Sequence, residues 1–326
     1  MRLPLAALAA TALAAQSAIV IIPAANAETQ TAPLELLKKI ASAARDLNYA
    51  GTFVYQHGNQ VETSRITHSS DQSGDYAKLE ALDGPPREII RSNDEIRCYL
   101  PESKTVKIET RKFDKSFPAL LPEGFLRVTE HYNLTRGPIN RVAGHTCQVL
   151  VLEPKDNLRY GRTFCAETET GLLLKARTLN EKEELVEQIA FTHLIIGAVD
   201  REMLKSKYAG EQWKVDHTAS PVLASKETGW AVKSQPAGFK KIMEMRRHMA
   251  GKTEPVSHLV FSDGLAAVSV FIEPVPKGKI VNQSSLQQGA INVHTRAAGE
   301  HMITVLGEAP AATVMQIASS VAPVGK

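Results

Sequence analysis

Short β-type segments separated by turn residues dominate the chain between residues 49 and 192. Each is rich in aromatic or β-branched residues and is bounded by Gly, Pro, Asn or Asp. Strands are expected at residues 51–55, 61–67, 76–82, 87–91, 95–100, 104–108, 147–152, 159–165, 171–175 and 187–192. Because short turns join consecutive segments, the pattern predicts a large antiparallel meander, which we expect to be a curved sheet, or half-barrel.

An amphipathic helix precedes these segments. Pro33 suits a first helical position, and apolar residues recur at helical spacing from Leu34 to Leu47. Such a helix must pack on an apolar surface, which the sheet can provide. A helix and loops over the concave face of a curved sheet would enclose a hollow that holds a lipid without any catalytic residue. Residues 113–125 are expected to be a loop or lid.

The chain changes character after residue 200, which predicts an α+β protein of two domains. Residues 28–200 are expected to form the sheet domain, and residues 201–228, mostly charged or small, a connector with at most one helical stretch around 201–208. A smaller α+β domain is expected over 229–326. Its clearest element is a hairpin at Asp263-Gly264, because a tight turn between apolar runs requires residues that tolerate positive φ.

The first twenty-seven residues have the pattern of a secretory signal peptide. Arg2 is the only charged residue before Glu28, and the apolar run between them ends in Ala25-Asn26-Ala27. We expect cleavage after Ala27 and export out of the cytosol, which excludes cytosolic nucleotide and chromosome chemistry. An uncleaved membrane anchor is the alternative, because the run is long enough to span a bilayer.

Three cysteines are an odd number for an oxidising compartment. Cys147 and Cys165 flank a turn expected near residue 156, so the two thiols lie near each other across the hairpin and can form a disulfide. Two separately buried thiols are the alternative, and the spacing does not decide between them. Cys98 would be left unpaired.

The composition and motifs favour a binding protein over an enzyme. The chain is 43% hydrophobic and 22% charged with a formal net charge of +3, which is typical of a soluble globular protein and gives no reason to expect nucleic acid as a partner. It has no Gly-x-Ser-x-Gly motif, and no two of its ten histidines lie within four residues of each other. We therefore expect no catalytic residue, metal ligand or cofactor.

Basic residues are interspersed among the expected strands near residue 90. Arg87 and Arg91 can bind the phosphate groups of a lipid, since guanidinium groups pair well with phosphate. The alternative, which the strand pattern favours, is that they lie on the solvated outer face of the sheet.

Several segments, in order, resemble a known family. They are residues 48–55 (NYAGTFVY), 82–91 (LDGPPREIIR), 159–161 (RYG), 170–175 (TGLLLK), Trp230, 236–239 (PAGF), 261–265 (FSDGL) and 303–308 (ITVLGE). Together they are similar to the RseB/MucB family of periplasmic sigma-E regulatory proteins, and the resemblance spans nearly all of the chain after residue 27.

The resemblance implies a first domain like the lipoprotein carriers LolA and LolB. It also implies a regulator that binds the periplasmic region of an anti-sigma factor, RseA or MucA, and shields it from the site-1 protease. Lipopolysaccharide or a related lipid would loosen that complex. Trp230 and Phe239 are candidate aromatic contacts for the partner, or else core residues. The alternative function is a periplasmic lipid or lipoprotein carrier, which would need only the first domain. Homo-oligomerisation is left open.

Overall fold

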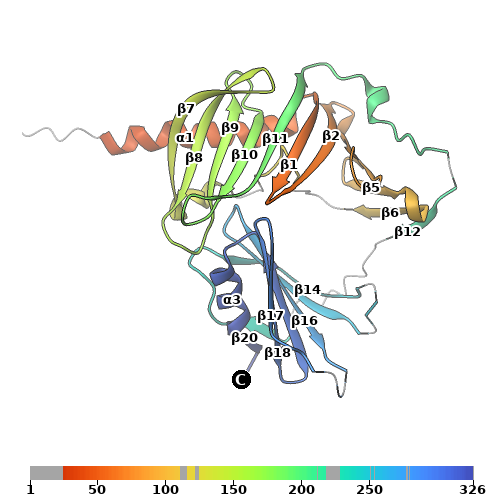
Figure 1. Ribbon diagram of the computed structural model, residues 1–326, viewed down its shortest axis with the longest axis vertical. Helices are drawn as coiled ribbons and strands as arrows, with labels where there is room; N and C mark the ends of the chain where they lie inside the picture. Colours follow the sequence, from red (N-terminus) through yellow and green to blue (C-terminus); the bar gives the residue numbers. More distant parts are fainter. Residues whose placement is uncertain are drawn as a thin grey trace, which may run out of the picture.

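Two domains make up the part of the chain that the computed structural model describes (Figure 1). The described residues are 25–110, 116–121, 125–210, 212–217, 228–249, 251–252, 254–276, 278 and 280–325. The predicted signal peptide therefore lies almost entirely outside the described residues, as do parts of the expected lid and connector. Among the described helices, none is both long and apolar enough to cross a membrane.

The first domain is built on a twelve-stranded sheet with the order β12-β6-β5-β4-β3-β2-β1-β11-β10-β9-β8-β7. The strands are β1 Tyr49–His57, β2 Gln60–Asp71, β3 Gly74–Ala81, β4 Glu88–Ser92, β5 Glu95–Leu100, β6 Thr105–Thr110, β7 Tyr132–Val142, β8 His145–Pro154, β9 Gly161–Glu167, β10 Leu173–Leu179, β11 Leu185–Ile196 and β12 Lys214–His217. All pairs are antiparallel except β12 with β6. The predicted open, curved antiparallel sheet is confirmed (Figure 1). β7 and β12 were not expected.

Helix α1 (Ala25–Asp46) lies across the β7–β10 half of the sheet (Figure 1). It begins before Pro33, which lies inside the helix, so the expected start at Pro33 was wrong. Leu37 and Ile40 are fully buried against the sheet, which confirms the predicted apolar face. The short helices of this domain are η1 Pro101–Ser103, η2 Phe125–Arg127 and α2 Val128–His131.

Part of the expected connector packs on the outer face of this sheet. It begins with the short helix η3 (Arg201–Leu204) and ends in β12. Beneath it, the Lys78 ammonium lies 2.9 Å from the Glu88 carboxylate and donates to the backbone oxygen of Lys205. Trp213 packs edge-on against the ring of Tyr99. Residues 201–210 and 212–217 therefore pack on the first domain, and β12 adds a strand to the connector, for which only a helical stretch was expected.

The second domain has a six-stranded antiparallel sheet with α3 (Ala311–Ser320) on one face (Figure 1). Its strands, in the sheet order β14-β15-β16-β19-β18-β17, are β14 Lys240–Arg247, β15 Val256–Ser262, β16 Ala267–Pro274, β19 His301–Gly307, β18 Ile291–Ala298 and β17 Ser284–Gln288. A separate pair, β13 (Trp230–Val232) with β20 (Val321–Pro323), closes the end near α3. The predicted hairpin at Asp263-Gly264 joins β15 and β16.

Cys147 of β8 and Cys165 of β9 form a disulfide, with their Cα atoms 5.4 Å apart. Val149 is the direct cross-strand partner of Cys165, so the bridge runs diagonally between the two strands. Cys98 in β5 is a free thiol.

His258 of β15 makes the stability of the second domain depend on pH. Its ring stacks on Phe271 at 4.2 Å between centroids and is only 5% exposed. Burial first, and then the charge of Arg247, lower the pKa of His258 from 6.5 to about 4. The folded state thus favours the neutral ring of His258. The contribution of this group to the free energy of unfolding is complete above about pH 6.5 and is lost as the pH falls towards 4.

The free energy of unfolding of the wild type should therefore fall between pH 7.5 and pH 5. His258→Phe keeps a ring on Phe271 and removes the titration, so its decline over this range should be smaller. Urea denaturation at both pH values measures the difference. Equal declines in the two proteins would show that His258 is not the group responsible.

Candidate binding site

The inner face of the large sheet carries the apolar core of the first domain. Cross-strand pairs place Phe53, Ile66 and Leu79 on this face, which α1 covers in part. The ring of Phe117 also packs here, 5.2 Å from Phe53 and 4.8 Å from Phe191. Phe117 belongs to the expected lid and is 4% exposed. In this conformation Phe117, Leu120 and Leu121 of the expected lid pack against the apolar core on this face.

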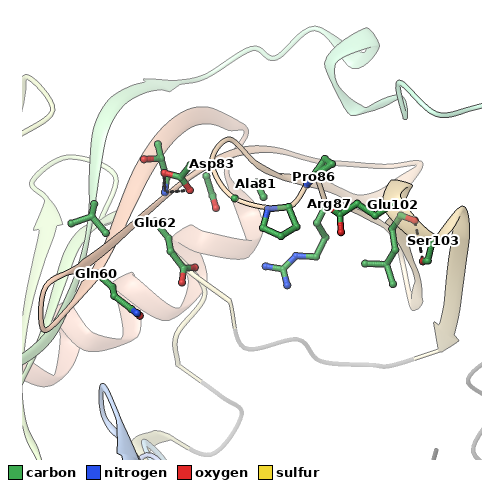
Figure 2. A pocket seen from close by; sticks show the side chains of 14 residues that line it. Gln60, Glu62, Ala81, Asp83, Pro86, Arg87, Glu102 and Ser103 are labelled. Carbon is green, nitrogen blue, oxygen red and sulfur yellow. Dashed lines mark hydrogen bonds between the residues drawn. The ribbon is translucent and has the colours of Figure 1, made fainter.

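An open pocket of about 760 Å³ remains on the inner face at the ends of β2, β3 and β5. Figure 2 shows the side chains that surround it. The lining residues are Gln60, Val61, Glu62, Thr63, Ser64, Ala81, Asp83, Gly84, Pro85, Pro86, Arg87, Leu100, Glu102 and Ser103. The pocket therefore combines apolar side chains with charged and hydroxyl groups.

Arg87 is an exposed basic residue that lines this pocket. Figure 2 shows its guanidinium across the space from Glu62. The rim beside it is fixed, because the Asp83 carboxylate accepts a hydrogen bond of 2.9 Å from the backbone N–H of Thr63. That hydrogen bond lowers the pKa of Asp83 below its usual value. The expectation that Arg87 lies on the outer solvated face was wrong, because Ile89, two residues along, pairs with Leu79 of the inner face. An exposed guanidinium beside apolar groups can bind a phosphate that carries a hydrocarbon chain.

Arg91 lies on the same inner face but is already paired. Its guanidinium donates to both oxygens of Asp75 at 2.8 and 2.9 Å. Burial raises the pKa of Asp75, but the hydrogen bond from His68 and the charge of Arg91 outweigh it and hold the pKa below its usual value. His68 also bonds the backbone oxygen of Leu47 at 2.7 Å. Arg91 thus stabilises the end of α1, and the structure does not favour it as a phosphate ligand.

Trp230 and Phe239 lie in different environments. Trp230 is partly buried in β13, where its ring meets His301 edge-on at 5.0 Å. Phe239 is 2% exposed and belongs to the core of the second domain. For Phe239 the structure agrees with the alternative of a core residue, and its ring is covered by the guanidinium of Arg159.

Arg159 is the centre of the contact between the domains. Its side chain is fully buried, and its Nε donates to Asp263 of the β15–β16 turn at 3.0 Å. It also bonds Asp156 and the backbone oxygen of Ala237. Asp263 is itself fixed, because it accepts hydrogen bonds from the backbone N–H groups of Leu265 and Ala266. A buried charge pair thus links the two domains.

Apolar and close backbone contacts complete this junction. Leu265, from the second domain, is 3% exposed and packs within the core of the first. Gly238 has φ +84°, and a Cβ there would lie 2.0 Å from the ring of His131. Neither contact is visible in the sequence, because each joins segments that local pattern treats as separate domains.

A smaller pocket of about 220 Å³, which we call the junction pocket, lies where the inner face meets the second domain. Arg162 of β9 and Glu308 of the second domain face each other there at 3.5 Å. Leu120 of the lid and Ile291 of β18 line the same pocket. A ligand between the domains would therefore touch the lid and both sheets.

The comparisons with known proteins cover both domains. Residues 32–212 match the family model described as the MucB/RseB N-terminal domain, and residues 224–322 match the MucB/RseB C-terminal domain. The sigma factor AlgU regulatory protein MucB of Pseudomonas aeruginosa is 31% identical over 319 residues, which cover 94% of each chain. The sigma-E factor regulatory protein RseB of Escherichia coli K12 is 25% identical over 299 residues, 91% of this chain and 92% of that protein.

Solved structures give the same result. MucB in complex with MucA(peri) superimposes with a TM-score of 0.71 at 29% identity, over 90% of this chain and 99% of that one. The Pseudomonas aeruginosa MucA/MucB complex gives a TM-score of 0.73 at 29% identity, over 91% and 100%. The two relatives are named as sigma factor regulatory proteins, and both solved structures are complexes of MucB with MucA. On the evidence of both domains, the chain belongs to the MucB/RseB family.

Proposed function

We propose that this protein is a periplasmic negative regulator of the sigma-E envelope stress response. It binds the periplasmic region of an anti-sigma factor of the RseA/MucA type and protects it from site-1 proteolysis. The observation that carries the proposal is the similarity to MucB in complex with MucA(peri), which extends over both domains. A partner site that needs both domains agrees with the buried Arg159–Asp263 pair, which holds them in one arrangement.

Isothermal titration calorimetry with a soluble periplasmic fragment of the anti-sigma factor tests this function. The full chain without residues 1–27 should form a one-to-one complex with a dissociation constant of about 1 μM or lower, as expected for a specific regulatory interface. No detectable heat at tenfold higher concentrations, with no complex in gel filtration, would contradict the proposal and favour the lipid-carrier alternative.

Lipopolysaccharide or a related lipid releases the partner in this proposal. The pocket beside Arg87 supports it, because the pocket offers an exposed guanidinium next to Val61, Pro85 and Leu100. A lipid phosphate would pair with Arg87, while an acyl chain would follow the inner face towards the lid. Displacement of Phe117 by that chain would alter the segment that lines the junction pocket through Leu120.

Arg87→Gln should weaken the response to lipid about tenfold, since one charge-assisted hydrogen bond to phosphate is lost. The measurement is the concentration of purified lipopolysaccharide that releases half of the anti-sigma fragment. Arg97→Gln is the matched control, because Arg97 lies on the outer face and pairs with Glu95. Equal release curves for Arg87→Gln and the wild type would remove Arg87 from the lipid site.

A further inference from the structure

Strand β17 leaves an open edge on the second domain. It is the outermost strand of the six-stranded sheet, and no other described strand pairs with its far side. All five of its residues, Ser284–Gln288, are exposed, and Leu286 is 67% exposed. An outer strand presents a row of backbone N–H and C=O groups that can pair with another chain.

The other outer strands of the two larger sheets carry features that discourage such pairing. β14 has four basic residues and an irregular register between Lys241 and Met243. β7 contains Pro138 and a register shift between Arg136 and Ile139. β12 has only four residues, among them Lys214 and Asp216. Charges, proline and bulges are the usual means of protecting an edge.

The β17 edge has none of these features. Residues 280–293 contain no charged residue and no proline, although 22% of the whole chain is charged. The register of β17 with β18 is regular over all five pairs. Such an edge is suited to accept a further strand.

The turn that follows β17 fixes this edge against the first domain. The backbone N–H of Ala290 donates to Glu187 of β11 at 3.2 Å, and the Tyr55 hydroxyl donates to the same carboxylate oxygen at 2.7 Å. Gly289 has φ +55°, and a Cβ there would lie 2.8 Å from the Tyr55 hydroxyl oxygen. Ile291, just beyond, lines the junction pocket. The edge therefore leads directly to the contact between the domains (Figure 1).

We propose that β17 pairs with an extended segment of the anti-sigma factor, which adds a seventh strand to this sheet and continues towards the junction pocket. The inference rests on the proposed function and specifies how the partner binds. Backbone pairing would supply the affinity, and alternate side chains the specificity. Leu286 pairs with Val293, so these side chains share a face, and the added segment should carry apolar residues at every second position beside them.

A second copy of this chain fits the edge less well. Five residues span about 17 Å, and two folded domains that meet along so short an edge bury less than the roughly 1,000 Å² of a specific interface. An extended segment has no such limit, because it can leave β17 at Gly289 and contact the first domain as well.

Proline and alanine substitutions at each of residues 284–288 test the proposal. In an antiparallel pair, alternate residues direct their N–H towards β18 or away from it. Proline at an outward position removes one donor from the open edge, whereas alanine at the same position keeps it. Outward proline variants should keep the wild-type circular dichroism and melting temperature but bind the anti-sigma fragment about tenfold more weakly. Their alanine counterparts should bind within about twofold of the wild type.

Leu286→Lys serves as a second variant, since it keeps every N–H and places a charge on an exposed side chain of the edge. It should fold and lose affinity to a similar extent. If the wild type binds the fragment and the folded proline variants and Leu286→Lys bind equally well, the strand-addition proposal is wrong while the regulatory function stands. If the wild type does not bind, both proposals fail. Sedimentation velocity tests for a second copy at this edge. If the wild type is a dimer and only the outward proline variants are monomers, the edge binds a second copy of this chain instead.

Discussion

The Asp263→Asn variant is expected to lose about 3–5 kcal/mol of unfolding free energy, because removing one partner of a buried ion pair leaves the other charge uncompensated. Arg159 is fully buried, and Asp263 is its partner from the second domain. Asparagine keeps the oxygen that accepts from the backbone of Leu265 and Ala266, so the turn itself should persist. Urea denaturation followed by circular dichroism measures the change.

Glu308→Gln is the control for this prediction, because its pair with Arg162 also joins the two domains but is 38% exposed on the glutamate side. Partly exposed pairs of this kind contribute about 0–1 kcal/mol. A loss of less than 1 kcal/mol in Asp263→Asn would contradict a buried pair at the junction.

Loss of the Cys147–Cys165 disulfide should lower the unfolding free energy by about 3 kcal/mol, because a bridge that closes a loop of this length restricts the unfolded chain by about that amount. The two cysteines are 18 residues apart and buried, so replacement by alanine also removes packing in the core. The expected result is a lower melting temperature in the Cys147→Ala/Cys165→Ala variant, measured by differential scanning calorimetry.

Reductant provides the internal control for the disulfide. Dithiothreitol should destabilise the wild type and leave the double alanine variant unchanged. Cys98→Ala should behave as the wild type in both conditions, because Cys98 is a free thiol. A wild type that is insensitive to reductant after full reduction, verified by thiol titration, would show that the bridge adds no stability.

Strands with aromatic and β-branched residues could be predicted from sequence, because their pattern is local. β7 escaped prediction because only its first residues, Tyr132 and Leu134, are buried, while the rest of the strand is polar and contains Pro138. β12 escaped because it has four residues and pairs in parallel with β6, more than one hundred residues earlier in the chain. Pairing over such distances leaves no periodic signal in a short segment.

The site could be predicted only in part. The sequence treats Arg87 and Arg91 alike, but Arg91 is paired with Asp75, sixteen residues away, and the pattern of β4 does not reveal this pairing. Arg159 lies in an expected strand and Asp263 in an expected hairpin turn. Their pairing could not be predicted, because the two residues are 104 positions apart in the chain. A phenylalanine such as Phe239 can serve either as a surface anchor for a partner or as a core residue. Only its position below the guanidinium of Arg159 shows that it is a core residue.

Cleavage of the anti-sigma periplasmic fragment by its site-1 protease tests the central proposal most directly. The fragment should be cut several-fold more slowly when this protein is present in excess, and purified lipopolysaccharide should restore the rate. The Arg87→Gln variant should protect equally well but need more lipid for release. A cleavage rate that is the same with and without this protein would contradict the account, provided that the fragment stays intact when the protease is left out.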